Sequence, residues 1–111
     1  MPDPEQAPHP NPLEGWFIED EPVEIQVAGV RLKVKEIAAD RYMHLVGQAN
    51  RAGTFDTNAY GTLLIQEMVV EPELTEEDLA RLKPGIKAVL IRQLEGLLGV
   101  TPEALKNEIS G

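Results

Sequence analysis

The sequence contains no cysteine, so disulfide bonds and thiolate chemistry, whether catalytic or metal-binding, are excluded. Serine occurs once, at Ser110, and histidine twice, at His9 and His44. No glycine-rich phosphate loop, calcium loop or zinc spacing is present. We interpret His44 as a surface or half-buried helix residue and the carboxylate runs as local helix and surface features. We therefore expect no catalytic, cofactor or metal residues, and a protein that is not an enzyme.

Positive charge is also scarce, and apolar runs are short. Residues 1–30 hold seven acidic residues and no lysine or arginine, and the formal net charge of the chain is −9. This surface repels phosphate backbones, so nucleic-acid binding is disfavoured, whereas a basic protein partner is compatible with it. The acids can equally be a solvated face that keeps the chain soluble. No window approaches the ~20 apolar residues of a membrane span, and no secretory signal is visible, so we expect no membrane association.

The 111 residues suit one domain preceded by an arm. Five prolines and few apolar side chains make residues 1–15 a disordered N-terminal arm in our interpretation, with the single domain at 16–111. Trp16-Phe17-Ile18 follows abruptly. We expect this triplet to fold back over the core of its own domain, because large aromatic side chains are costly to leave in water. The alternative is that it is a docking peptide for a partner.

Alternation over residues 23–35 predicts a half-buried β-hairpin with Ala28-Gly29 as its turn. That turn places Val27 opposite Val30, Ile25 opposite Leu32, Val23 opposite Val34 and Glu24 opposite Lys33. Alanine is a poor residue for the positive φ that the preferred two-residue turns demand, so a bulge or longer loop is the alternative.

Helical spacing then takes over. We expect a helix over residues 37–51, a second from an N-cap at Asp56 or Thr57 to a stop at Pro72, and a third from a Thr75–Asp78 capping box. After a break at Pro84-Gly85, a strongly periodic run ends at Gly99, and a short final helix begins at residue 101. The prediction is an α+β fold, mostly α, in which an N-terminal β-hairpin packs on a bundle of four to five short helices. The residues predicted to be buried are Val27, Leu32, Leu45, Leu64, Val89, Leu90 and Leu94.

Part of this pattern resembles a known family. The hairpin ends in Val34-Lys35-Glu36-Ile37 and is followed by a helix centred on Tyr42, by Asp56, and then by Tyr60-Gly61-Thr62-Leu63-Leu64. The continuation Val69-Val70-Glu71-Pro72-Glu73-Leu74-Thr75-Glu76-Glu77-Asp78-Leu79 matches a Val-x-x-Pro-x-Leu-Thr-x-x-Asp-Leu passage that precedes a leucine-rich helix. Residues 23–100 thereby resemble the tail assembly chaperones of long-tailed bacteriophages.

The resemblance implies a non-catalytic protein of the host cytoplasm that binds tape-measure protein and helps recruit tail-tube subunits. It also suggests a longer product made by a −1 ribosomal slip, for which Leu105-Lys106-Asn107 is the candidate site. Alternatives are a small structural phage component, such as a connector or tail-completion protein, and an acidic adaptor or antitoxin-like module that binds a basic protein. The oligomeric state is left open. The residues nominated for protein binding are Trp16, Phe17, Val69, Val70, Glu71, Glu73, Leu74, Glu76 and Glu77; ordinary core packing is the alternative for Val69, Val70 and Leu74.

Overall fold

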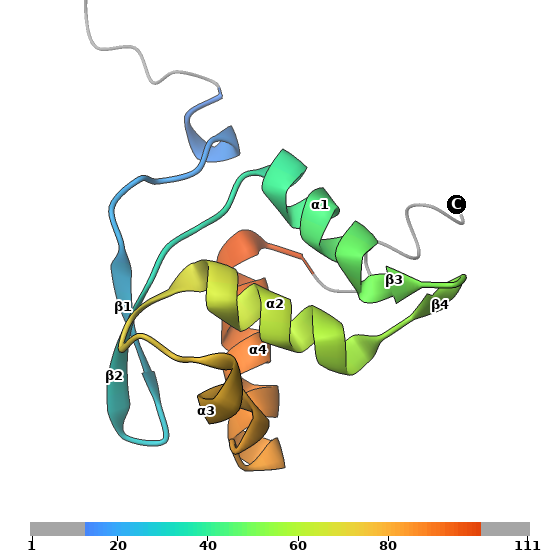
Figure 1. Ribbon diagram of the computed structural model, residues 1–111. Helices are drawn as coiled ribbons and strands as arrows, with labels where there is room; N and C mark the ends of the chain where they lie inside the picture. The colour runs from blue at the N-terminus through green and yellow to red at the C-terminus, as the bar shows by residue number, and fades with distance from the viewer. Residues whose placement is uncertain (1–12, 101–111) are drawn as a thin grey trace, which may run out of the picture.

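The computed structural model describes residues 13–100, which form an α+β fold (Figure 1). Four α-helices accompany small antiparallel sheets in this part of the chain. The predicted fifth helix, the candidate slip site and residues 1–12 of the predicted arm lie outside the described residues. In order, the elements are the 3-10 helix η1 (Glu14–Trp16), β1 (Val23–Val27), β2 (Val30–Val34), α1 (Ala39–Ala49), β3 (Asn50–Arg51), β4 (Thr54–Phe55), α2 (Thr57–Met68), β5 (Val69–Glu71), α3 (Glu76–Ala80) and α4 (Pro84–Leu98).

The β1–β2 hairpin has the predicted register, with Val27 opposite Val30, Ile25 opposite Leu32 and Val23 opposite Val34. Its turn is the two-residue kind, because Ala28 and Gly29 both adopt positive φ, 50° and 82°. The prediction of two strands was incomplete, since β5 adds a third strand beside β2 through the pairs Lys33–Glu71 and Val34–Val69.

The second helix ends earlier than predicted. Pro72 was expected to stop it, but α2 ends at Met68 and the chain continues as β5. Val69 and Val70 are β-branched residues, which favour an extended backbone. Here the chain pairs with β2, and the Lys35 amide donates to the Met68 carbonyl at 2.8 Å. The first helix, predicted over residues 37–51, is α1 at Ala39–Ala49, and the chain after it forms a small second hairpin, β3–β4.

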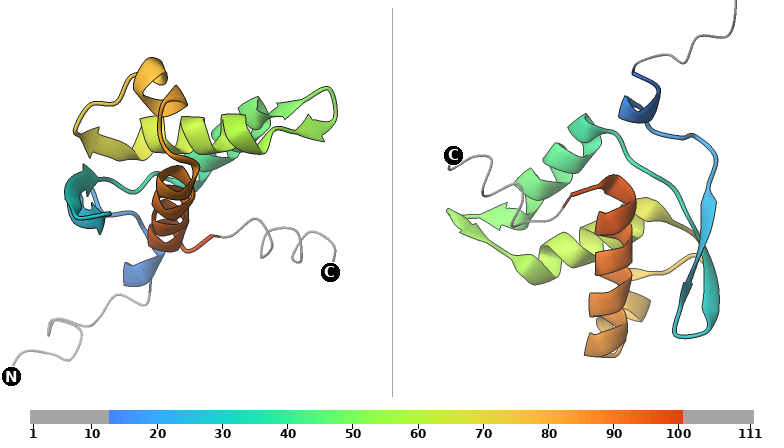
Figure 2. Two further views of the ribbon diagram at one scale, coloured as in Figure 1. Left: turned by 90° about the horizontal axis from the view of Figure 1, so that it is seen from below. Right: turned by 180° about the vertical axis from the view of Figure 1, so that it is seen from behind.

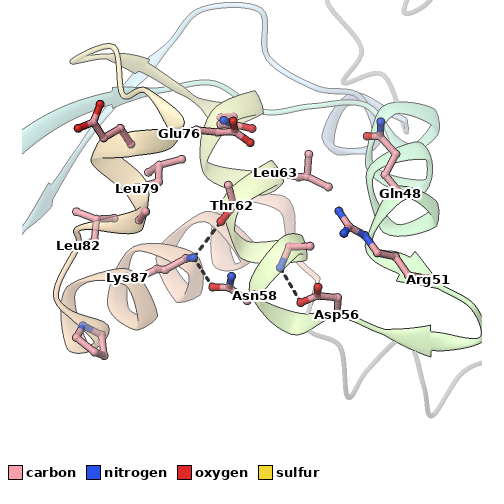
Figure 3. Close-up of a pocket in the computed structure, with 15 residues that line it drawn as sticks. Gln48, Arg51, Asp56, Asn58, Thr62, Leu63, Glu76, Leu79, Leu82 and Lys87 are labelled. Carbon is pink, nitrogen blue, oxygen red and sulfur yellow. Dashed lines mark hydrogen bonds between the residues drawn. The ribbon is translucent and has the colours of Figure 1, made fainter.

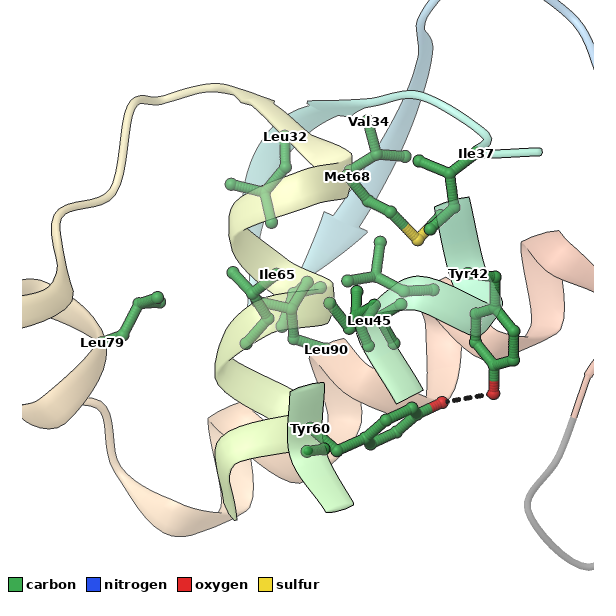
Figure 4. Packing of buried hydrophobic residues seen from close by; sticks show 14 residues of the cluster. Leu32, Val34, Ile37, Tyr42, Leu45, Tyr60, Ile65, Met68, Leu79 and Leu90 are labelled. Atoms are coloured by element: carbon green, nitrogen blue, oxygen red, sulfur yellow. Dashed lines mark hydrogen bonds between the residues drawn. The ribbon is translucent and has the colours of Figure 1, made fainter. Parts of the chain in front are cut away.

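Helix α2 is the centre of the core (Figure 4). It contacts α1, α4 and β5, and α4 in turn contacts β1 (Figure 2). Gly61 permits the close α2–α4 approach, because a Cβ at this position would lie 2.4 Å from Ile91 Cδ1. The hairpin contributes its inner face to the same cluster through Val27, Leu32 and Val34. The prediction of burial is confirmed for Val27, Leu32, Leu45, Leu64, Leu90 and Leu94.

Two predictions about burial were wrong. Val89 is 41% exposed, because it lies ~100° around α4 from Leu90 and away from the face that meets α2. The aromatic triplet does not cover the core, since Trp16 is 78% and Phe17 64% exposed. The alternative interpretation of the triplet, a docking segment, is the one compatible with this exposure.

Candidate protein-binding site

An open groove of about 1050 Å³ runs across α2, between α3 and the start of α4 on one side and the end of α1 with β3 on the other (Figure 3). Leu63 and Leu82 are half-buried and give it apolar surface, and Leu79, which is only 2% exposed, lies beneath as part of the core. Glu76 and Glu77 stand at the α3 side, and Arg51 at the β3 side. We call this site the groove. Its lining residues are Gln48, Arg51, Asp56, Asn58, Ala59, Thr62, Leu63, Gln66, Glu76, Glu77, Leu79, Ala80, Leu82, Pro84 and Lys87.

Local sequence signals fix the helices that form the walls. Thr75 Oγ1 accepts from the Asp78 amide at 3.1 Å, and Asp78 Oδ2 accepts from the Thr75 amide at 3.0 Å, which is the predicted capping box. The Thr75 backbone N–H lowers the pKa of Asp78 by stabilising its charged form. Asp56 caps α2 by accepting from the Ala59 amide at 3.0 Å. These caps place Glu76 and Glu77 in the first turn of α3, where the positive end of the helix dipole favours acids.

Lys87 crosses the floor of the groove and joins α4 to α2. Its Nζ donates to Asn58 Oδ1 at 2.8 Å and to Thr62 Oγ1 at 3.0 Å (Figure 3). Within residues 13–100 it forms no ion pair with a carboxylate. Its charge is therefore held by neutral dipoles and is available to a carboxylate that enters the groove.

The lining of the groove combines apolar side chains with polar and charged ones. Its lining contains neither serine, histidine nor cysteine, which are the usual nucleophiles and bases. In the described part of the chain no cluster of three or more His, Cys, Asp or Glu side chains could hold a metal ion. Among the same residues, no helix is both long and apolar enough to cross a membrane. Leucines flanked by charges of both signs suit an amphipathic protein segment.

The nine residues nominated from the sequence fall in three places. Glu76 and Glu77 line the groove, as exposed first-turn residues of α3. Trp16 and Phe17 project from the N-terminal segment. The other five lie in and after β5: Val69 and Leu74 pack against the core, Val70, Glu71 and Glu73 are exposed, and Glu71 pairs with Lys33 at 3.6 Å.

A smaller hollow of about 510 Å³ lies beside β2, where β5 ends and Pro72 follows. Of the nominated residues it contains Glu71, together with Val30 and Leu32 of the hairpin. None of the nominated residues around β5 lines the groove with Glu76 and Glu77, although they are close in the sequence.

Sequence analysis missed Lys87, Asn58, Thr62 and Arg51. Lys87 carries a signal that could have been used, because it lies about 60° around α4 from Leu90, on the side of the apolar stripe, where a lysine needs polar partners. Those partners come from α2, which nothing in the local pattern of α4 reveals.

Sequence analysis also missed a polar chain inside the core. Tyr60 Oη donates to Glu95 Oε2 at 2.8 Å, and Tyr42 and Tyr60 hydroxyls lie 2.9 Å apart (Figure 4). Because Tyr60 gives its proton to Glu95, Tyr42 is the donor of the second bond. Glu95 is only 8% exposed. Burial raises the pKa of both tyrosines, and the hydrogen bond that Tyr60 donates to Glu95 raises the pKa of Tyr60 further.

Comparisons of the chain with models of protein families, with curated proteins and with solved structures give no match.

Proposed function

We propose that this protein is a non-catalytic tail assembly chaperone, which binds an amphipathic segment of tape-measure protein in its groove and keeps that segment in solution in the host cytoplasm. The observation that supports the proposal best is the groove itself, where the half-buried Leu63 and Leu82 lie among charges of both signs. Help in recruiting tail-tube subunits belongs to the same proposal and rests on the sequence resemblance alone.

The size and openness of the groove favour a peptide over a small molecule. Pockets for small ligands enclose their ligand and occupy roughly 300–1,000 Å³, and the groove, at about 1050 Å³, is open along one side. A helix could lay an apolar stripe on Leu63 and Leu82. Basic residues at its edge would then face Glu76 and Glu77, which fixes its orientation.

The direct test dilutes an aggregation-prone tape-measure fragment from denaturant into buffer with and without the full chain, and follows light scattering. We expect a stoichiometric excess of the protein to suppress scattering without any nucleotide. Glu77→Lys should weaken binding about threefold, because it reverses a charge at the rim without touching the core. Asp40→Lys is the matched control, since Asp40 is also an exposed acid in the first turn of a helix but lies outside the groove.

A further variant separates the groove from the surface around β5. Val70 is exposed and does not line the groove, so Val70→Asp should leave suppression unchanged. Loss of suppression in Val70→Asp or Asp40→Lys, with Glu77→Lys normal and all variants melting like the parent, would place the client elsewhere. Failure of the unaltered protein to suppress scattering would refute the chaperone proposal.

A further inference from the structure

The N-terminal segment of the described chain presents unused binding surface. Residues 13–18, which we call the aromatic arm, turn through η1, where the Trp16 amide donates to the Leu13 carbonyl at 2.9 Å. At the base of the arm the Glu19 amide donates to Glu36 Oε2 at 3.0 Å. The arm lies by the N-terminal end of α1 (Figures 1 and 2). Trp16 and Phe17 are the two most exposed large apolar side chains of the described residues.

The acidic residues next to the arm indicate the charge that a binding surface for the arm must carry. Glu19, Asp20 and Glu21 follow directly, are exposed, and form no ion pair within residues 13–100. A complementary surface must offer an apolar floor for the two aromatic rings and positive charge beside it. An anionic membrane lacks that charge.

The lining of the groove contains both features, together with the carboxylates of Asp56, Glu76 and Glu77, from which an acidic segment must keep away. Leu63 and Leu82 are half-buried and supply apolar area, and Arg51 and Lys87 supply positive charge. Neither cation has a carboxylate within ion-pair distance among the described residues. Lys83, exposed at the start of α4, adds a third charge beside the lining residues Leu82 and Pro84.

The arm cannot reach the groove of its own molecule while Glu19 stays bonded to Glu36. Three residues separate Trp16 from that bond, a span of about 10 Å at most. The arm lies by the N-terminal end of α1, and the groove begins at Gln48 and Arg51, beyond the other end of this 11-residue helix, which is about 16 Å long. An occupant of the same chemistry must come from another molecule.

We propose that the aromatic arm of one molecule docks in the groove of a second copy, with Trp16 and Phe17 on the leucines and residues 19–21 against Arg51 and Lys87. The proposal rests on the proposed function in using the same groove, and it makes the arm a competitor of the client. Arm and groove are different surfaces, so the contact is head-to-tail and produces a ring or an open chain of copies. A client that binds the groove breaks this assembly.

The test needs only the purified full chain, because Trp16 is its single tryptophan. Sedimentation velocity gives the average mass over a range of protein concentrations, and the emission maximum of Trp16 is recorded on the same samples. We expect the mass to rise with concentration, the emission to shift to shorter wavelength as Trp16 leaves water, and the two curves to share a midpoint. Added salt should move that midpoint to higher concentration, since the contact pairs opposite charges.

Two variants and their mixture identify the surfaces. Trp16→Ala with Phe17→Ala removes the arm contacts, and Arg51→Glu reverses a groove charge; each should raise the dissociation constant about tenfold or more. Mixed together they should form a one-to-one dimer, because the first keeps its groove and the second keeps its arm. Trp16 of the Arg51→Glu copy then reports the docking. Arg92→Glu, an exposed charge reversal on α4 outside the groove, is the control that should associate normally.

A chain that stays monomeric with unshifted Trp16 emission overturns the proposal, as does association that survives both variants or a mixture that fails to dimerise. The outcome is separable from that of the chaperone proposal. Suppression of tape-measure aggregation by a monomeric chain would leave the chaperone proposal standing and the arm contact refuted. Self-association through arm and groove without any suppression would give the opposite result.

Discussion

At the scale of single residues, Tyr60 is the most consequential side chain of the core. Its hydroxyl is bonded to both Glu95 and Tyr42, so it links α2 to α4 and to α1. A buried polar group that loses its partner costs about 1–3 kcal/mol, more than a hydrogen bond contributes on average. Removing the Tyr60 hydroxyl, which makes both hydrogen bonds, therefore has a larger effect than removing the Tyr42 hydroxyl, which makes one.

We expect Tyr60→Phe to lower the free energy of unfolding by about 2 kcal/mol, because it leaves the Glu95 carboxylate buried without its donor. Tyr42→Phe should cost about 1 kcal/mol, since Glu95 keeps its bond to Tyr60. Combining Tyr60→Phe with Glu95→Met should recover part of the loss. Urea denaturation measures all three, and equal costs for the two single variants would show that Glu95 does not depend on Tyr60.

The Arg41–Glu67 pair gives stability a dependence on pH. Arg41 Nε donates to Glu67 Oε2 at 2.9 Å, and Nη2 contacts Oε1. This hydrogen bond, helped by the positive charge of Arg41, lowers the pKa of Glu67 below that of an ordinary carboxyl. The contribution is present above the unfolded value of about 4.3 and disappears as pH falls through the lowered folded pKa.

Glu67→Gln should therefore reduce stability at pH 7, and its difference from the unaltered protein should shrink on acidification towards pH 3. Urea midpoints measured from pH 7 to pH 3 give this difference directly. Glu73→Gln, which changes an exposed carboxylate without an ion pair in the described residues, is the control and should track the unaltered protein. A Glu67→Gln difference that stays constant over the whole range would contradict the assignment.

At the scale of elements, the two hairpins use the same unusual turn. Ala28-Gly29 and Ala52-Gly53 both place alanine at positive φ, 50° and 51°, followed by glycine at 82° and 79°. The right-handed twist of the strands favours this geometry, although alanine pays about 1 kcal/mol for the left-handed conformation.

Asparagine tolerates that conformation, so Ala28→Asn and Ala52→Asn should each stabilise the protein by about 0.5–1 kcal/mol. Thermal melts and urea midpoints measure the gain, and the double variant should show the sum because the turns lie in separate sheets. Ala39→Asn, in the first turn of α1 where φ is helical, is the control that should not stabilise. A loss of stability in either turn variant would contradict the positive φ assigned to the alanine at that position.

Elements with a complete local signal were predictable from the sequence. The β1–β2 register follows from alternation within twelve residues, and the α3 start from two side chains three residues apart. Elements that depend on a distant partner were not. Strand β5 exists because β2 offers it an edge, and the face of α4 that turns Val89 outward is chosen by α2.

The same distinction applies to the candidate site. Glu76 and Glu77 were nominated as acidic residues that closely follow Pro72 in the sequence, whereas Lys87 acquires its partners from α2, 25 and 29 residues earlier in the chain. Trp16 and Phe17 were nominated for protein binding, and their exposure could not be read from the local sequence, which gave burial as the first expectation. Long-range pairing is what sequence patterns within one element cannot report.

At the scale of the whole molecule, the excess of nine negative charges acts on folding and on binding in opposite directions. Of the three ion pairs of the described residues, Arg31–Glu24 and Lys33–Glu71 are mostly exposed and contribute little. The remaining acids repel one another, and this repulsion destabilises the compact state. A basic client edge, in contrast, is attracted by the same charges.

Salt should therefore stabilise the fold and weaken the client complex. Between roughly 10 and 300 mM NaCl the screening length falls from about 30 Å to below 8 Å, so distant repulsions between acids vanish first. We expect the melting temperature to rise by about 2–4 °C over this range. Binding of the tape-measure fragment to the groove should weaken, with slower association, because attraction between its basic edge and Glu76 and Glu77 is screened.

Differential scanning fluorimetry and stopped-flow association in the same buffers measure the two effects. Potassium sulfate at matched ionic strength separates screening from the general stabilisation of apolar burial that sulfate adds. A client complex that strengthens with salt would mean that apolar contact alone holds it, and that the acidic rim has no part in recognition.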